Sequence, residues 1–482
     1  MKTFQNIRPL FLAFSCLALL TLNKIALASA PLPSALSAAL SKAQVPPEAV
    51  SIWAQALDAT SPTLSLNESM PMNPASVMKL PTTYAAFEKL GSTYAWQTRL
   101  ASDGTIANGK LQGNLYLVGT GDPTFYYEHL WKMLRQLRQL GVQEIAGSIF
   151  LDNTALKLPA FDPGQFDQKS LRPYNAGPDG LLINFNALRI SLLPTPGAGQ
   201  PTILFDPPLA GLKVVNQVRT EPGACGLWFK NLDAKLDAQG GARTLTLSGT
   251  WHDECGPKDW EVAPLASPDY AATLITSLWA ELGGKIQGKF FIGAAPANSK
   301  TLLTHSSAPL ANAIRDMNKW SNNQIARQIQ VTLGREADPT HLDMAERGNL
   351  AILSSLNENG ISTAGWEVGN GAGLSRQSRL TAKGLGAMLV SVWNKPYMGE
   401  FLASLPIAGE DGTAYRRLKG SAAQGRAWLK TGTIDDVSAI AGYVQDKNNR
   451  RWAIVMIANH PNALNTRAAQ DVFVNWVWNA GN

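Results

Sequence analysis

Three short polar motifs stand far apart in this chain and constrain its fold more than any other feature. The motifs are Ser76-Val77-Met78-Lys79, Ser321-Asn322-Asn323 and Lys430-Thr431-Gly432-Thr433. Their hydroxyl, amine and carboxamide groups can act on one substrate only if the three segments meet in a single pocket. The sequence therefore predicts a fold that brings a helix near residue 76, a helix start near residue 321 and a strand near residue 430 together.

The first motif pairs a nucleophile with a base. On a helix, the spacing of Ser76 and Lys79 puts the hydroxyl and the amine on one face, one turn apart. A serine hydroxyl is a poor nucleophile unless a base takes its proton, and a lysine can do so when burial and a nearby positive charge lower its pKa. Asn73 and Pro74 favour a helix start just before this pair, and Pro81 predicts a kink just after it.

The second motif has an ordinary interpretation and a catalytic one. In the ordinary interpretation Ser321 is the N-cap of a helix that begins at Asn323. In the catalytic one Ser321 passes a proton between Lys79 and the leaving amine, while the Asn323 carboxamide holds Lys79 and a substrate amide.

The third motif follows a strand-like stretch. Gly432 would let a substrate lie close to the strand edge, and Lys430, Thr431 and Thr433 could hold a terminal carboxylate. The backbone N–H groups of Thr433 and the first-motif serine would form an oxyanion hole. Alone, the motif could equally be a plain strand end with a surface lysine.

The combination of motifs decides between these interpretations. Their order and local context describe an acyl-transfer serine site that works without histidine. The five histidines of the chain lack the context of a Ser-His-Asp triad, and the Gly-x-Ser-x-Gly elbow is missing from the sequence.

The N-terminus predicts export. Residues 1–30 read as a signal peptide, with Lys2 and Arg8 before an apolar run and small residues that allow cleavage after Ala28 or Ala30. An uncleaved membrane anchor is the alternative, although the run is short for a full span. No later stretch of the sequence is apolar enough to span a membrane. The expected location is the periplasm.

Two cysteines remain after the leader, Cys225 and Cys255, and in an exported protein they favour one disulfide. Two unrelated buried thiols are the alternative. Metal binding is not expected, because no histidine or further cysteine stands at ligand spacing. The formal net charge of +6, halved once the leader is removed, is too small to predict a nucleic-acid partner.

The patterning predicts an α/β (α+β) protein of two interleaved parts. Helical periodicity and two apolar C-terminal strands mark a catalytic domain formed by residues 31–95 and 300–482. Short alternating strands separated by Gly, Asp and Pro turns mark a large, mainly β insertion over residues 96–299. Within it, a turn-rich stretch over about 196–262 predicts a nested β lobe, so that the insertion forms one or two extra lobes.

The motifs resemble those of the class C low-molecular-mass penicillin-binding proteins, the D-alanyl-D-alanine carboxypeptidase/endopeptidase family of serine peptidases. The distance from Lys79 to Ser321 is far greater than in a class A β-lactamase. Further stretches that look like this family are Gly113-Asn114-Leu115-Tyr116-Leu117-Val118-Gly119-Thr120-Gly121-Asp122-Pro123, Tyr174-Asn175-Ala176-Gly177, Gly371-Ala372-Gly373-Leu374-Ser375-Arg376 and Leu405-Pro406-Ile407-Ala408-Gly409.

The resemblance implies a β-lactamase/transpeptidase-like three-layer domain and a periplasmic serine DD-peptidase that needs no cofactor. It implies cleavage of D-Ala-D-Ala termini, of D-alanyl cross-links, or of both, in peptidoglycan stem peptides, with β-lactams as acylating inhibitors. When the motifs are matched to those of the family, the resemblance implies that Ser76 is the nucleophile and Lys79 the base. It also implies that Ser321 relays a proton and that Asn323 positions Lys79 and the substrate. The substrate carboxylate would be bound by Lys430, Thr431 and Thr433, the carboxylate clamp.

Two other functions remain open at this point. One is a β-lactamase, which the long insertion and the lack of an obvious deacylating carboxylate argue against. The other is a non-catalytic peptidoglycan-binding protein on the same fold, which the intact set of serine, lysine and asparagine side chains argues against.

Overall fold

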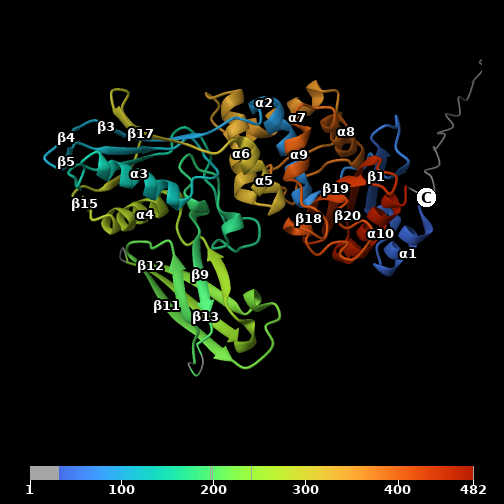
Figure 1. The fold of residues 1–482 in the computed structure, drawn as a ribbon, viewed down its shortest axis with the longest axis horizontal. Helices are drawn as coiled ribbons and strands as arrows, with labels where there is room; N and C mark the ends of the chain where they lie inside the picture. Colours follow the sequence, from blue (N-terminus) through green and yellow to red (C-terminus); the bar gives the residue numbers. More distant parts are fainter. Residues whose placement is uncertain (1–31, 196, 198, 240–241, 481–482) are drawn as a thin grey trace, which may run out of the picture. The chain divides into compact units, whose positions relative to one another are not determined.

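The computed structural model describes residues 32–195, 197, 199–239 and 242–480 (Figure 1). The predicted signal peptide, residues 1–30, lies outside the described residues. Within those ranges no helix combines the length and the apolar character that crossing a membrane requires.

The catalytic motifs are built around a five-stranded antiparallel sheet with strand order β18-β19-β20-β1-β2. The two C-terminal strands predicted from the sequence are β19 and β20, and the third motif lies on β18 at one edge. The strands are β1 (Val50–Ala56), β2 (Leu64–Leu66), β18 (Ala427–Ile434), β19 (Val437–Gln445) and β20 (Arg451–Asn459).

Helices cover both faces of this sheet, because successive strand residues point to opposite sides. Ala441 and Tyr443 of β19 belong to the core of one face, and Ile440 and Val444 to the core of the other. One face packs against α1 (Ser34–Lys42) and α10 (Arg467–Trp478). The other packs against α2 (Lys79–Leu90), α5 (Leu310–Lys319), α6 (Asn323–Ala337), α7 (Met344–Glu358), α8 (Ala382–Trp393) and α9 (Met398–Ser404). This is the predicted three-layer arrangement.

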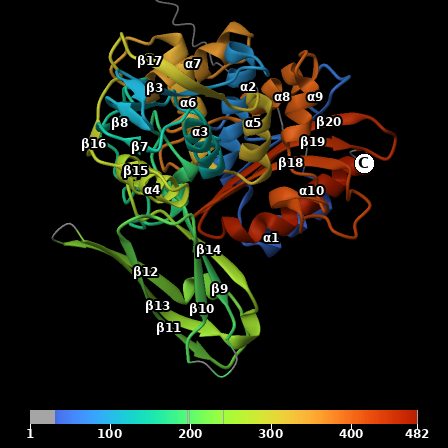
Figure 2. The same ribbon diagram turned by 60° about the vertical axis from the view of Figure 1, so that its left-hand side comes forward.

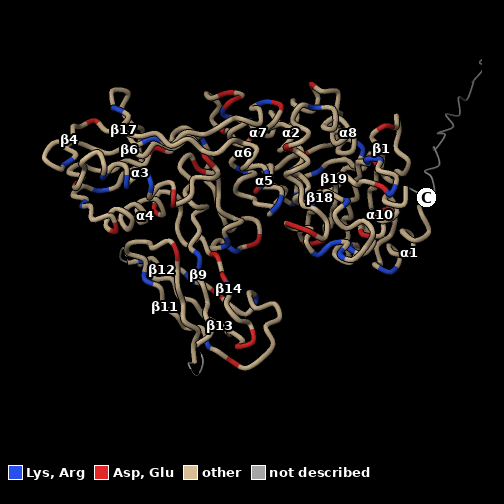
Figure 3. The backbone as a smooth tube through the Cα atoms, in the orientation of Figure 1, with Lys and Arg blue, Asp and Glu red and all other residues tan. Residues whose placement is uncertain are grey.

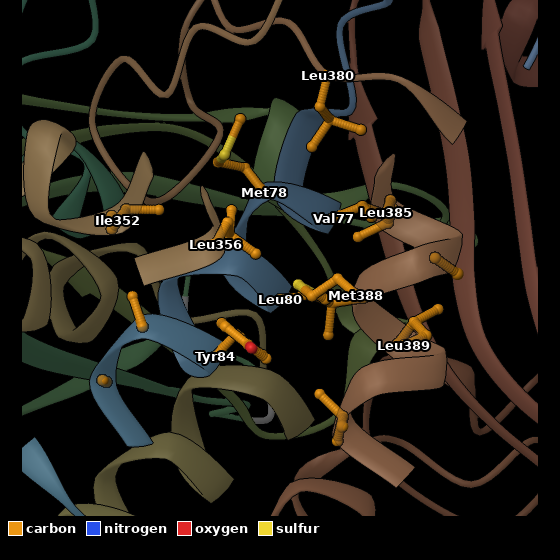
Figure 4. Packing of buried hydrophobic residues seen from close by; sticks show 14 of the residues in the cluster. Val77, Met78, Leu80, Tyr84, Ile352, Leu356, Leu380, Leu385, Met388 and Leu389 are labelled. Carbon is orange, nitrogen blue, oxygen red and sulfur yellow. The ribbon is translucent and has the colours of Figure 1, made fainter. Parts of the chain in front are cut away.

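Helix α2 is the central element of the larger core. Figure 4 shows its side chains Leu80 and Tyr84 among residues of α7 and α8, and both are fully buried. A 3-10 turn, η2 (Ala75–Met78), carries Ser76 directly before this helix. Ser76 is therefore held in place by a heavily packed element on its C-terminal side.

The kink expected at Pro81 is not present. The α-helix begins only at Lys79 and runs unbroken to Leu90, so Pro81 falls in its first turn. The N–H groups of a first turn have no partner inside the helix, so a proline there removes no backbone hydrogen bond. Asn73 is not the N-cap, because η2 begins after Pro74 and α2 after Met78. Its Oδ1 instead accepts a hydrogen bond from the Ala75 N–H at 2.9 Å, just before the turn that carries Ser76.

The start of α6 also differs from the ordinary interpretation of the sequence. The N-cap is Asn322, whose Oδ1 accepts from the Ile325 N–H at 2.9 Å, and not Ser321. Ser321 instead adopts a left-handed backbone conformation with φ of 58°. Because Asn322 takes the capping role, the Ser321 hydroxyl is available for other contacts.

Between α2 and α5 the chain forms two sheets with strand orders β16-β8-β6-β3-β17 and β15-β7-β5-β4. Two amphipathic helices, α3 (Tyr127–Gln139) and α4 (Ser267–Glu281), contribute to their common core. The strands are β3 (Gln97–Ser102), β4 (Thr105–Ala107), β5 (Lys110–Gln112), β6 (Leu115–Val118), β7 (Glu144–Ile145), β8 (Ile149–Asp152), β15 (Lys285–Ile286), β16 (Phe290–Ile292) and β17 (Lys300–Ser306).

Strands β9 to β14 gather in a lobe of their own, drawn in green (Figures 1 and 2). It holds two three-stranded sheets with orders β10-β9-β14 and β11-β13-β12. The Cys225–Cys255 disulfide closes a loop in this lobe across a sequence separation of 30, which confirms the predicted bridge. The strands are β9 (Leu188–Leu193), β10 (Thr202–Asp206), β11 (Leu212–Glu221), β12 (Leu232–Gln239), β13 (Ala242–His252) and β14 (Lys258–Val262).

Removing this bridge is expected to destabilise the lobe without affecting the catalytic motifs. Cys225→Ser with Cys255→Ser should lower the free energy of unfolding of the lobe by about 3 kcal/mol, because the unfolded chain regains the entropy of the open loop. Differential scanning calorimetry measures the loss, and the rate of labelling by a fluorescent penicillin serves as the control. An unchanged melting profile would contradict the expected contribution.

Candidate active site

The Lys79 amine joins the first two motifs. Its Nζ lies 3.0 Å from Ser76 Oγ, 2.7 Å from Asn323 Oδ1 and 2.7 Å from the carbonyl oxygen of Ala372. The amide and carbonyl oxygens can only accept hydrogen bonds, so they take two N–H groups of the amine. If Lys79 is neutral, its lone pair then faces the Ser76 hydroxyl, which is the geometry a general base needs.

Burial favours this neutral form. Lys79 has no exposed surface. Its pKa is lowered well below the ordinary value, first by desolvation and then by the positive charges of Lys430 and Arg327. The two conditions that the sequence argument required of a lysine base, burial and a neighbouring cation, are both present.

The second and third motifs also meet. Lys430 Nζ donates hydrogen bonds to Ser321 Oγ at 2.9 Å and to the carbonyl oxygen of Thr431 at 2.9 Å. The side chain is fully buried, and desolvation lowers the pKa of Lys430 to about 7. The Ser321 hydroxyl, on a residue with left-handed backbone, thus faces the Lys430 amine.

Gly432 allows the third motif to lie against the turn that carries Ser76. A Cβ atom at this position would be about 3.0 Å from the Ser76 nitrogen and 3.1 Å from the Val77 nitrogen, and it would overlap the Pro74 carbonyl oxygen. Any larger residue would therefore push β18 away from the turn that carries Ser76. The half-buried Thr431 and the exposed Thr433 flank this contact.

One part of the site was not identified as functional from the sequence, the loop that supplies the Ala372 carbonyl. Thr82 Oγ1 donates to the Gly371 carbonyl at 2.7 Å and so ties this loop to α2. Gly373 lies so close to the Ala75 carbonyl that a side chain could not fit. The glycines around Ala372 were visible in the sequence, but a carbonyl oxygen is common to all residues and leaves no pattern of its own.

Arg327 is the second group that the sequence did not indicate. It lies on the buried α6, and its guanidinium donates to the Ala176 carbonyl at 2.8 Å and stands 5.3 Å from the centre of the Phe161 ring. Burial lowers the pKa of Arg327 to about 10. The arginine therefore links α6 to the segment around residue 176 while adding positive charge near Lys79.

The four residues proposed as catalytic and the third motif are thus in one cluster, and their roles remain a proposal. In the described ranges, no three or more His, Cys, Asp or Glu side chains gather where they could hold a metal ion.

Comparison with known proteins identifies the family. Residues 32–479 match the D-Ala-D-Ala carboxypeptidase 3 (S13) family. The D-alanyl-D-alanine carboxypeptidase of Actinomadura sp. (strain R39) is 30% identical over 389 residues, which cover 77% of this chain and 70% of the relative. The chain belongs to this family of serine hydrolases, which confirms the predicted class of D-Ala-D-Ala carboxypeptidases.

Solved structures show the same fold. Penicillin binding protein 4 (dacB) from Haemophilus influenzae matches with a TM-score of 0.76 and 24% identity, covering 92% of this chain and 99% of that one. The same protein complexed with a β-lactam matches with a TM-score of 0.72 and 23% identity, over 92% and 99%. These matches confirm the predicted transpeptidase-like fold with its large additional lobes.

The lowered pKa of the Lys79 amine predicts how the rate of acylation depends on pH. The rate of acylation by a fluorescent penicillin is expected to fall as the pH is lowered, because the amine becomes protonated as the pH passes below its lowered pKa. Lys79→Arg should prevent acylation at all pH values tested, since a guanidinium keeps its proton. Stopped-flow labelling between about pH 4 and pH 9 measures both. A rate that rises toward acid pH would contradict the role of Lys79 as base.

Proposed function

We propose that this protein is a periplasmic serine DD-peptidase that cleaves peptidoglycan stem peptides at D-Ala-D-Ala termini or D-alanyl cross-links. The observation that carries the proposal is the position of the Lys79 amine between Ser76 Oγ and Asn323 Oδ1. Family membership supplies the reaction class, and this geometry supplies a nucleophile, a base and a positioning amide. The periplasmic location rests on the predicted signal peptide.

Acylation follows from these groups. Lys79 takes the proton of the Ser76 hydroxyl, and Oγ forms a bond to the carbonyl carbon between the two D-alanines. The N–H groups of Ser76 and Thr433 stabilise the negative oxygen of the tetrahedral intermediate. When the C–N bond breaks, the amine leaves with a proton delivered from Lys79 through the Ser321 hydroxyl. Asn323 holds Lys79 in place and is free to bind a substrate amide as well.

Deacylation regenerates the site. A water molecule attacks the ester carbonyl carbon, and Lys79 accepts its proton. The ester bond to Ser76 then breaks, and the proton passes from the lysine to the serine oxygen. The product leaves with a new carboxylate, so one amide and one water are consumed in each cycle.

The third motif is proposed to recognise a free carboxylate. Lys430 supplies the positive charge, and the hydroxyl groups of Thr431 and Thr433 supply hydrogen bonds. Because β18 is an edge strand, its outward backbone groups can pair with an extended peptide. A substrate lying along β18 would place its scissile bond beside Ser76, where Gly432 makes room.

We also propose the domain division expected from the sequence, with residues 31–95 and 300–482 as the catalytic domain and 96–299 as an insertion with a nested β lobe at about 196–262. The separation of hydrophobic cores supports the division between the catalytic domain and the insertion. Strand β17 (Lys300–Ser306) pairs with β3 of the insertion, however, so the second boundary lies after residue 306 and not at 300. The cores on the two faces of the catalytic sheet draw on residues before 97 and after 309, and the large middle core on residues 100–279.

Loss of the nucleophile gives the first test of the function. Ser76→Ala should lower covalent labelling by a fluorescent penicillin by at least about a thousandfold, because no oxygen remains to form the ester. Gel fluorescence measures labelling, and release of D-alanine from a pentapeptide measures turnover. Ser37→Ala, at an exposed position of α1, is the matched control. Equal labelling of Ser76→Ala and wild type would refute the assignment.

The lifetime of the acyl-enzyme separates a peptidase from a β-lactamase. We expect penicillin to remain attached for minutes or longer, because among the described residues no carboxylate forms a hydrogen bond to Ser76 or Lys79 and could activate a water against the ester. Mass spectrometry of the intact protein after removal of free penicillin follows this decay. Complete loss of the adduct within seconds would favour a β-lactamase.

The carboxylate clamp gives a second prediction for this site. Lys430→Ala should lower kcat/KM about 10- to 100-fold for peptides that end in a free carboxylate, because a charge-assisted hydrogen bond is lost. Peptides with an amidated C-terminus should lose much less. Lys419→Ala, which removes an exposed cation outside the motif, is the control. Equal losses for both peptides would show that Lys430 does not bind the carboxylate.

A further inference from the structure

A second cavity opens directly beside the third motif. It has a volume of about 380 Å³ and lies between β18, the short turn η7 (Gly412–Ala414) and the start of α10. Thr431 Oγ1 donates to Thr413 Oγ1 at 3.2 Å, so the cavity begins at the residues proposed to bind the carboxylate. The lining is Gly412, Thr413, Tyr415, Arg416, Arg417, Thr431, Gly432, Thr433, Ser438, Ala439, Arg467 and Gln470.

All charged side chains that line this cavity are positive. Its lining contains three arginines and neither aspartate nor glutamate. Arg417 forms an ion pair with Asp471, whose carboxylate lies 2.6 Å from the guanidinium and offsets its charge. Arg416 and Arg467 are exposed, and no ion pair within the described residues involves either of them. Figure 3 shows basic segments beside α10, where Arg467 begins the helix and the helix dipole adds further positive potential.

The walls of the cavity are held in place by contacts that do not use these two arginines. Gln470 donates to Ser438 Oγ at 3.0 Å and accepts from Arg417 at 3.2 Å, which ties α10 to β19 and to the segment after η7. On the other side, Lys319 forms an ion pair with Asp411, directly before η7. The two exposed guanidinium groups therefore border a preformed space.

The size of the cavity exceeds what a single alanine needs. At about 30 Å³ for each water, the space of about 380 Å³ corresponds to roughly a dozen waters, which is more than one D-alanine molecule would displace. In the proposed reaction the group that leaves carries a carboxylate next to its amine, and that carboxylate is bound by the third motif. The cavity borders Thr431, Gly432 and Thr433, so it offers space for a larger leaving group just beyond this carboxylate.

We propose that this cavity is the leaving-group subsite, and that Arg416 and Arg467 determine specificity by binding carboxylates of a leaving peptide that is larger than D-alanine. The occupant is the acceptor strand of a cross-link, a peptide amine with at least one free carboxylate beyond the one beside the scissile bond. The inference rests on the proposed function and assigns cross-links as the preferred substrate class. As the C–N bond breaks and the amine gains its proton, the product stays paired with the two guanidinium groups until it dissociates.

The test compares two substrates and one inhibitor in the full-length protein. The double variant Arg416→Gln, Arg467→Gln should lower kcat/KM for a purified cross-linked muropeptide dimer about tenfold, because two charge-assisted contacts are lost. D-alanine release from a monomeric pentapeptide and the rate of fluorescent penicillin labelling should change by less than about threefold. Raising the salt concentration should reduce the wild-type preference for the dimer, since exposed charges are screened.

Arg426→Gln is the matched control. It removes an exposed arginine just before β18 that is not part of the lining, and it should leave both substrates unaffected. Equal losses for dimer and pentapeptide in the double variant, no loss for either, or a wild-type protein that releases D-alanine but does not cleave the dimer would each overturn the proposal. Wild-type protein that neither binds penicillin nor releases D-alanine would instead refute the proposed DD-peptidase function.

Discussion

The contact between the buried Lys79 amine and the Ser76 hydroxyl, at 3.0 Å, is the interaction that the surrounding elements maintain. An exposed lysine would be protonated at neutral pH and could not accept the proton of Ser76. The surroundings of Lys79 remove water and add positive charge, and two oxygen acceptors orient its N–H groups. Much of the fold serves to maintain this environment, from the packed face of α2 to the loop around Ala372.

Helix α6 also holds the site in place, and it is buried along most of its length. It presents Asn323 to the site and uses polar side chains on its other turns to bind backbone carbonyls from the middle of the chain. Arg327 binds the Ala176 carbonyl, and Gln328 binds those of Gly121 and Asp179 at 3.0 and 2.9 Å. The insertion is therefore part of the structure that holds α6, and with it Asn323, in place.

The sequence predicted the chemistry better than the local geometry. Ser76, Lys79 and Lys430 could be recognised because side-chain chemistry at fixed spacing leaves a pattern. The left-handed backbone of Ser321 and the capping role of Asn322 could not be distinguished, since serine and asparagine are both good caps. The Ala372 carbonyl had no side-chain signature, and the cation at Arg327 is identifiable only from the folded chain. The kink at Pro81 was wrong because the helix start was placed too early.

The protonation state of Lys79 can be measured directly. The chemical shift of its ε-carbon, measured by NMR across a pH titration and assigned by comparison with Lys79→Arg, reports that state without catalysis. We expect a midpoint well below the ordinary lysine value, and a higher midpoint when Lys430 is replaced by alanine. A midpoint near 10.5, unaffected by the charge of Lys430, would show that Lys79 is an ordinary protonated lysine and not a base.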